Sequence, residues 1–180
     1  SRMKIMRLHG IDRDVWARFT TNKPSWEYDV VAPGFKYNLS DLQAAVGLAQ
    51  LERAEELRRK RETLALRYLA RLAGLKAVEL PTIEVDPREH AWHLFPIVVR
   101  PGARCDRGAL IESLAARGIG TSVHYKPIHR LTYYRERYGL KAESYPHAER
   151  FWAGCLALPL FPSLREDEQD YICDSLHDLL

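Results

Sequence analysis

The segment from Ser40 to Gly74 constrains the fold more than any other part of the sequence. Ser40 and Gln43 have the spacing of a capping box, in which each side chain satisfies an unpaired backbone amide of the first helical turn. Apolar residues follow at helical spacing: Leu42, Ala45, Val46, Ala49, Leu57, Leu64 and Tyr68. Charges of both signs occupy the opposite side from Glu52 to Arg61, as expected of a solvated face rather than a nucleic-acid stripe. The pattern predicts one long amphipathic helix.

Beyond this helix, short apolar runs alternate with helical patterns. Strands are predicted at 76–80, 93–99, 121–125 and 156–161, and Pro96 moves the second of them toward a sheet edge or a bulge. Helices are predicted from Asp106 to Gly118, at 131–138, at 146–155, and from a second capping box at Ser163 and Glu166. The fold class is therefore α/β or α+β, with a small sheet covered by helices.

The N-terminal part has a different character. A short apolar stripe at Met3 and Met6 predicts a helix that stops at Gly10. The stretch from Ile11 to Gly34 is rich in aromatic residues but has little helical period. We interpret it as an extended arm or hairpin that packs against another part of the protein.

Composition narrows the class of protein. The chain is 46% hydrophobic and 28% charged with a formal charge of +3, which is ordinary for a soluble globular protein and argues against nucleic acid as the main partner. We see no run long enough to cross a membrane and no secretion signal. Three widely spaced cysteines favour a reducing cytoplasm over a disulfide framework or a metal cluster.

Two polar segments are candidate sites. Lys36 and Asn38 lie beside a glycine and just before the capped helix, where they could bind an anion such as phosphate, or form a plain loop. The segment 118–129 ends a predicted strand with His124, Tyr125 and His129, side chains that carry or donate protons. A structural role for the histidines is the alternative, and metal binding is disfavoured because their spacing matches no closed site.

Two further motifs have alternatives that the sequence leaves open. His90 and His93 resemble a ligand pair, but a core or capping role suits residues that precede an apolar strand. Tyr133, Tyr134 and Arg135 suit stacking on a flat ring or gripping a phosphate. They equally suit an aromatic helix face that rests on the sheet.

Several motifs, in order, resemble those of the DegT/StrS-type sugar aminotransferases over about residues 7–180. They are Arg7-Leu8-His9-Gly10, the block Gly34 to Leu51, His90 to Phe95, Gly118 to Thr121 with His124-Tyr125, and Leu158-Pro159-Leu160-Phe161-Pro162. The Lys36-Tyr37-Asn38 version is similar to a subgroup that includes aminoarabinose-forming enzymes.

This resemblance implies the C-terminal domain of an aspartate-aminotransferase-type (fold type I) enzyme that depends on pyridoxal 5'-phosphate. Such enzymes are homodimers that move an amino group, usually from glutamate, to a nucleotide-linked keto sugar for cell-surface polysaccharide synthesis. Residues 1–35 then end the large domain and form an inter-subunit arm. Residues 36–74 form the linking helix, and residues 75–180 the small C-terminal α/β domain.

The resemblance also assigns residues. Lys36 and Asn38 are expected at the cofactor phosphate of the partner subunit, and His124 at the catalytic centre. Tyr125 and His129 are expected at the substrate. The lysine that forms the Schiff base is expected upstream of residue 1, so this chain alone is expected to be inactive.

Two other functions fit the same resemblance. One is a non-catalytic binding or regulatory domain of this fold. The other is a related pyridoxal-phosphate-dependent sugar dehydratase, in which histidine replaces the lysine.

Overall fold

The computed structural model describes residues 2–12, 29–86 and 88–180. The chain divides into two compact units, Ser1–Arg53 and Ala54–Leu180. Each unit is described separately below. No helix in the described part of the chain is long and apolar enough to cross a membrane.

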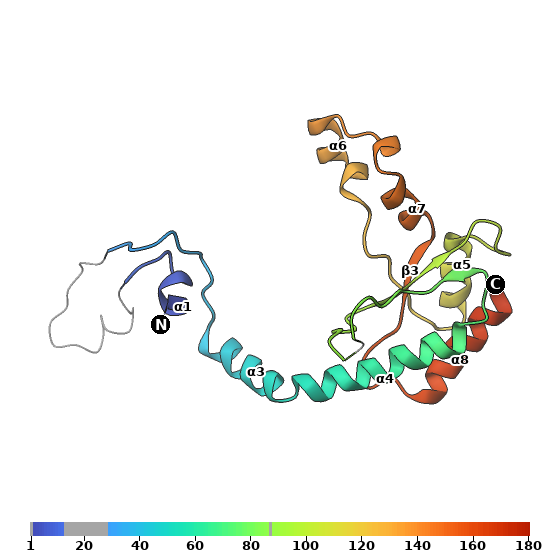
Figure 1. Ribbon diagram of the computed structural model, residues 1–180, viewed down its shortest axis with the longest axis horizontal. Coiled ribbons are helices and arrows are strands. Elements are labelled where there is room, and N and C mark those ends of the chain that lie inside the picture. Colours follow the sequence, from blue (N-terminus) through green and yellow to red (C-terminus); the bar gives the residue numbers. More distant parts are fainter. Residues whose placement is uncertain (1, 13–28, 87) are drawn as a thin grey trace. The chain divides into compact units, whose positions relative to one another are not determined.

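The second unit is built on a three-stranded antiparallel sheet in the order β1-β2-β3 (Figure 1). The strands are β1 (Val78–Glu79), β2 (Phe95–Val99) and β3 (Cys155–Leu158). Phe95 pairs with Leu158, and Val99 pairs with Val78. Three of the four predicted strands are therefore present, and the fold class is confirmed.

Proline shortens the pairing between β1 and β2. Pro96 lies in the central strand rather than at a sheet edge, and pairs with Ala157 of β3. On the side of β2 that faces β1, the Arg100 N–H donates to the Ala77 carbonyl, which marks these two residues as a hydrogen-bonded pair. In an antiparallel ladder such pairs recur at every second residue along each strand. Continuing the register places Pro96 opposite Pro81 at such a pair. Neither residue has an N–H to donate, which explains why β1 ends at Glu79.

The fourth predicted strand, 121–125, is reduced to a single bridge. Ser122 exchanges both backbone hydrogen bonds with Ala157, at 3.3 and 2.7 Å. Residues after Ser122 leave the sheet and enter the loop that carries His124.

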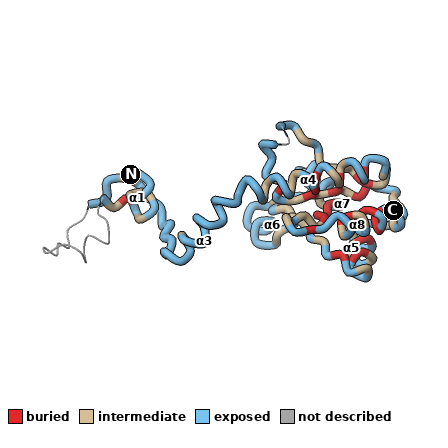
Figure 2. Tube along the Cα trace, turned by 90° about the horizontal axis from the view of Figure 1, so that it is seen from below, coloured by how far each residue is buried: buried red, intermediate tan, exposed pale blue. Residues whose placement is uncertain are grey.

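Helices α4 (Ala54–Leu72), α5 (Arg107–Ala116) and α8 (Glu166–Leu179) enclose the core of this unit. Figure 2 shows the buried residues gathered there. The largest fully buried side chains include Tyr68, Trp92, Phe95, Leu110 and Leu176. Asp106 caps α5 as predicted, because its Oδ1 accepts the Ala109 N–H at 2.9 Å.

The predicted cap of α8 is wrong. Ser163 lies in a turn closed by the bond from the Leu164 N–H to the Phe161 carbonyl, so it does not face the helix start. The helix begins two residues later than that cap requires. Its N-cap is Arg165, whose backbone N–H donates to Glu168 Oε2 at 2.9 Å.

A helical excursion connects the His124 loop to β3. It contains η1 (Ile128–Arg130), α6 (Thr132–Tyr138), η2 (Ala142–Ser144) and α7 (Pro146–Gly154). Both predicted helices are confirmed, and Pro146 occupies the first turn of α7 as expected. Figure 1 shows α6 at the tip of this excursion.

The first unit contains α1 (Arg2–Met6) and α3 (Asp41–Glu52). The capping box of Ser40 and Gln43 is present, but α3 buries none of its residues. The single helix predicted from Ser40 to Gly74 is interrupted at Arg53, which separates α3 from α4. Most of the predicted arm lies outside the described residues.

Gly154 should be essential for the join between α7 and the sheet. A Cβ atom there would lie 2.3 Å from the Val99 carbonyl oxygen, a backbone atom that cannot move without distorting β2. We expect Gly154→Ala to lower the free energy of unfolding by about 1–3 kcal/mol in urea denaturation. Gly74→Ala is the control, because nothing lies within 4 Å of its Cβ position. Equal stability of the two variants would contradict this packing.

Candidate active site

Lys36 lies on a short extended segment that the backbone of the first unit holds in place. Leu8 and Lys36 form an antiparallel bridge. On either side of Lys36, the Phe35 N–H donates to the Met6 carbonyl at 2.7 Å and the Tyr37 N–H donates to the Arg7 carbonyl at 2.8 Å. Within the part of this unit that the structure describes, backbone hydrogen bonds therefore position the segment.

The side chains of this segment alternate between two faces. Phe35 and Tyr37 stack their rings 5.0 Å apart at an interplanar angle of 10°, so both lie on one face. Extended backbone sends the intervening Lys36, and the next alternate residue Asn38, to the other face. Both side chains are exposed. A cation and an amide donor on one face are suited to an anion such as a phosphate group.

Two glycines allow the backbone near Gly10 to cross close to the backbone of residues 32–34, just before Lys36. We call this contact the glycine crossing. A Cβ atom on Gly34 would lie 1.9 Å from the Gly10 nitrogen, and one on Gly10 would lie 1.7 Å from the Ala32 carbonyl oxygen. Gly10 also has a φ of +75°, which favours glycine. No larger residue fits at either position without moving the backbone.

Gly34→Ala should therefore release the segment that carries Lys36. We expect hydrogen exchange at the His9 and Tyr37 amides to become faster, because both donate bonds across this crossing, to Phe35 and Arg7. Gly47→Ala in α3 is the matched control, since its Cβ would meet nothing within 4 Å. Unchanged protection of both amides in Gly34→Ala would show that the crossing does not hold the segment.

His124 and Tyr125 lie in the second unit, in the loop that follows the Ser122 bridge. His124 is half-buried, and its Nδ1 is 3.3 Å from the Ser122 hydroxyl. Its ring contacts the edge of the Tyr125 ring at 4.8 Å, and the peptide bond between them is cis. Tyr125 is 75% exposed, so its hydroxyl is available to a ligand. This arrangement leaves Nε2 of His124 to hold or transfer a proton.

His129 is placed differently, because only 6% of it is exposed. Its Nε2 lies 2.6 Å from Glu149 Oε1, and its ring stacks on Tyr145 at 4.5 Å. Arg130 also grips Glu149, with Nε 2.7 Å from Oε1 and Nη2 on Oε2. The substrate-binding role of His129 stays a prediction, and its observed contacts connect η1 to α7.

Glu149 was not found by sequence reasoning. It lies about twenty residues from its partners, and no local pattern marks it. The Arg130 guanidinium and, secondarily, His129 lower the pKa of the Glu149 carboxyl from 4.5 to about 2. The cluster thus joins the two ends of the helical excursion through one carboxylate.

The Glu149 cluster should make stability depend on acid pH. The unfolded carboxyl takes up its proton near pH 4.5 and the folded one near pH 2, so its contribution is complete above 4.5 and is lost as pH falls toward 2. We expect Glu149→Gln to flatten the fall in unfolding free energy over this window. Glu143→Gln, an exposed carboxylate of the same excursion, is the control. Parallel pH profiles for Glu149→Gln and wild type would contradict the assignment.

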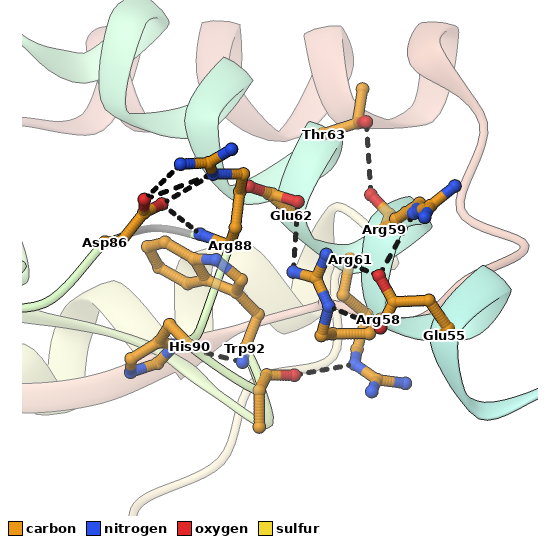
Figure 3. A network of polar contacts seen from close by, with 11 residues as sticks. Glu55, Arg58, Arg59, Arg61, Glu62, Thr63, Asp86, Arg88, His90 and Trp92 are labelled. Atoms are coloured by element: carbon orange, nitrogen blue, oxygen red, sulfur yellow. Dashed lines mark hydrogen bonds and ion pairs between the residues drawn. The ribbon is translucent and has the colours of Figure 1, made fainter. Parts of the chain in front are cut away.

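His90 and His93 have different surroundings. His90 Nδ1 accepts the Trp92 N–H at 3.0 Å, and its ring packs 4.5 Å from the Trp92 ring (Figure 3). Arg61 of α4 donates to the Ala91 carbonyl, which attaches the same turn to the helix. His93 is exposed. His90 therefore stabilises its own turn through the Trp92 N–H, and the buried Trp92 anchors that turn.

A pocket of about 520 Å³ lies beside α8. Its apolar lining is formed by Ile119, Pro159, Phe161, Leu164, Tyr171 and Ile172. None of the predicted site residues lines it. Across the described residues, no group of three metal-ligating side chains is close enough to hold an ion.

The chain belongs to the DegT/DnrJ/EryC1/StrS aminotransferase family, whose model matches residues 1–177. An uncharacterised protein of Methanocaldococcus jannaschii is 38% identical over 93% of this chain and 43% of its own length. The spore coat polysaccharide biosynthesis protein SpsC of Bacillus subtilis is 36% identical over 99% of this chain and 46% of its own. The chain thus spans less than half the length of these relatives.

Solved structures agree with this assignment. The putative sugar aminotransferase Spr1654 of Streptococcus pneumoniae, in its PMP form, matches with a TM-score of 0.80 and 34% identity, covering 97% of this chain and 43% of that one. Helicobacter pylori PseC, an aminotransferase of pseudoaminic acid biosynthesis, matches at 0.79 and 27%, covering 98% and 44%. DesV of S. venezuelae, solved with a ketimine intermediate, matches with a TM-score of 0.78 and 29% identity, covering 98% of this chain and 43% of that one. The family predicted from the motifs is confirmed.

Proposed function

We propose that this chain is the C-terminal part of a pyridoxal-phosphate-dependent aminotransferase that acts on a nucleotide-linked keto sugar, with glutamate as amino donor. Its similarity to Spr1654, PseC and DesV supports this reaction class. Spr1654 has been solved in PMP and PLP forms, which supports the cofactor. The observation in this chain that carries the proposal is the segment that presents Lys36 and Asn38 on one face.

Lys36 and Asn38 suit the cofactor phosphate. The ammonium supplies charge and the amide supplies a directed donor, and the Leu8 bridge fixes the backbone from which both project. We propose that they serve the site of a partner subunit in a homodimer. The unburied α3 and the exposed aromatic face of Phe35 and Tyr37 support such a role, since neither is covered within the described chain.

Bound pyridoxal phosphate supplies the electron sink that allows an amino group to leave one carbon and reach another. We propose that His124 handles a proton of that exchange through Nε2, with Ser122 orienting the ring from Nδ1. Tyr125, through its exposed hydroxyl, binds the sugar. We further propose that the lysine holding the cofactor belongs to the part of the protein outside this chain.

Two variants of the full-length enzyme should separate these roles. We expect Lys36→Ala/Asn38→Ala to weaken pyridoxal phosphate binding at least about tenfold, because charge-assisted bonds to the phosphate are lost. We expect His124→Ala to keep the cofactor but to lower kcat by about a hundredfold or more, as loss of a proton-transfer group does. Cofactor absorbance and amino transfer from glutamate to nucleotide-linked keto sugars measure the two effects.

The outcomes distinguish the proposal from its alternatives. An active wild type with an unchanged kcat in His124→Ala would remove His124 from the catalytic centre. A wild type that binds pyridoxal phosphate but eliminates water from the sugar instead of aminating it would indicate a dehydratase. A wild type that binds neither cofactor nor sugar nucleotide would indicate a regulatory domain.

A further inference from the structure

The segment from Tyr125 to Lys141, which contains η1 and α6, is more basic than the rest of the chain. It contains five basic residues and one acidic residue, a formal charge of +4, whereas the whole chain carries +3. The basic residues are Lys126, Arg130, Arg135, Arg137 and Lys141. Arg130 is neutralised by Glu149, and Arg135 lies 3.6 Å from Glu136. An excess of positive charge therefore remains around α6.

Exposed tyrosines accompany this charge. Tyr133 and Tyr138 are 66% and 64% exposed, and Tyr134 lies between them, in edge contact with Tyr133 at 5.3 Å and stacked on Tyr138 at 6.4 Å. No residue of α6 is buried. The sequence left open whether these rings rest on the sheet, and the structure excludes that alternative because α6 is exposed throughout its length.

Specific contacts hold the helical excursion that carries these groups. The Glu149 carboxylate joins His129 and Arg130 at its start to α7 at its end. Gly139, with a φ of +61°, closes α6 by donating its N–H to the Arg135 carbonyl. The tyrosines and arginines therefore project from an ordered base.

We propose that the tyrosine and arginine side chains of α6 bind the nucleoside diphosphate part of the substrate, an inference that rests on the proposed function. A tyrosine ring offers a stacking surface for a heteroaromatic base, and Arg137 offers a planar donor set for the diphosphate. The surface of one seven-residue helix is sized for a single nucleotide. A nucleic-acid strand would need a longer basic groove.

The test uses the full-length enzyme loaded with pyridoxal phosphate. Titration calorimetry with UDP, dTDP and GDP first identifies the tightest diphosphate, and the matching nucleoside and inorganic pyrophosphate then separate base from phosphate binding. We expect Tyr133→Ala/Tyr138→Ala to raise the Kd of the diphosphate and of the nucleoside about tenfold or more. Arg137→Gln should raise the Kd of the diphosphate and of pyrophosphate but leave that of the nucleoside unchanged.

Control variants separate a loss of binding contacts from a general loss of folded structure. Tyr133→Phe/Tyr138→Phe keeps the stacking rings and should bind like wild type, whereas a loss equal to that of the alanine pair would overturn the stacking role. Tyr171→Ala and Arg59→Ala remove an exposed tyrosine and an exposed arginine from α8 and α4, and should not change any Kd. The conversion of pyridoxal to pyridoxamine phosphate by glutamate alone should stay normal in all variants, because it needs no nucleotide.

Three outcomes would count against the proposal. If wild type binds a diphosphate and the α6 alanine pair binds it equally well, the inference fails while the proposed function stands. If wild type aminates keto sugars but binds no nucleoside diphosphate, the nucleotide is not recognised and the inference fails. If the α6-dependent ligand is oligouridylate rather than a free diphosphate, the surface is a nucleic-acid site instead.

Discussion

The second unit depends on the contact between α8 and α4, and a buried amide defines that contact. Gln169 is fully buried, and its Nε2 donates to the Leu64 carbonyl at 2.7 Å while Arg67 donates to its Oε1 at 3.2 Å. A buried amide without partners would cost about 1–3 kcal/mol, so this geometry admits one register of the two helices. The apolar residues around it provide most of the stabilisation, but they are less selective. Tyr68 adds a second fixed point by donating to the Pro159 carbonyl just beyond β3.

This fixed packing determines where the polar loop can start. Because β3 is held on both sides, by β2 and by the Ser122 bridge, the chain leaves the sheet at a defined place two residues before His124. The excursion that follows has no core of its own in α6. Its order comes instead from the Glu149 carboxylate and from the Gly154 contact with β2. Packing of the sheet thus positions the loop that carries His124, and the charged Glu149 cluster positions the helices that follow it.

The sequence predicted what depends on nearby residues. The Ser40 capping box, the Asp106 cap and the first-turn Pro146 are local features, and all three are present. It failed at one local feature, the Ser163 cap, because a turn at Phe161–Leu164 delays the start of α8. Its other failures lie where a distant contact decides. Pro96 is tolerated in the central strand because the register places it opposite Pro81, which also lacks an N–H. No local pattern in the sequence reveals that pairing. The partnership of His129 with Glu149 is equally distant in sequence. The order of several short motifs predicted the family, whereas the periodicity of apolar residues predicted only the fold class.

The two groups of candidate residues are held by different physical means. Among the described residues, backbone hydrogen bonds and a glycine crossing fix the segment that carries Lys36. Its position therefore tolerates changes in neighbouring side chains but not an added Cβ at Gly10 or Gly34. His124 follows a single bridge from Ser122 to Ala157 of β3, a strand that lies in the packed core and so has little freedom to shift. A phosphate contact requires charge and approximate position, whereas proton transfer requires a ring placed within a few tenths of an ångström. The firmer support therefore lies beneath the residue whose proposed chemistry demands greater precision.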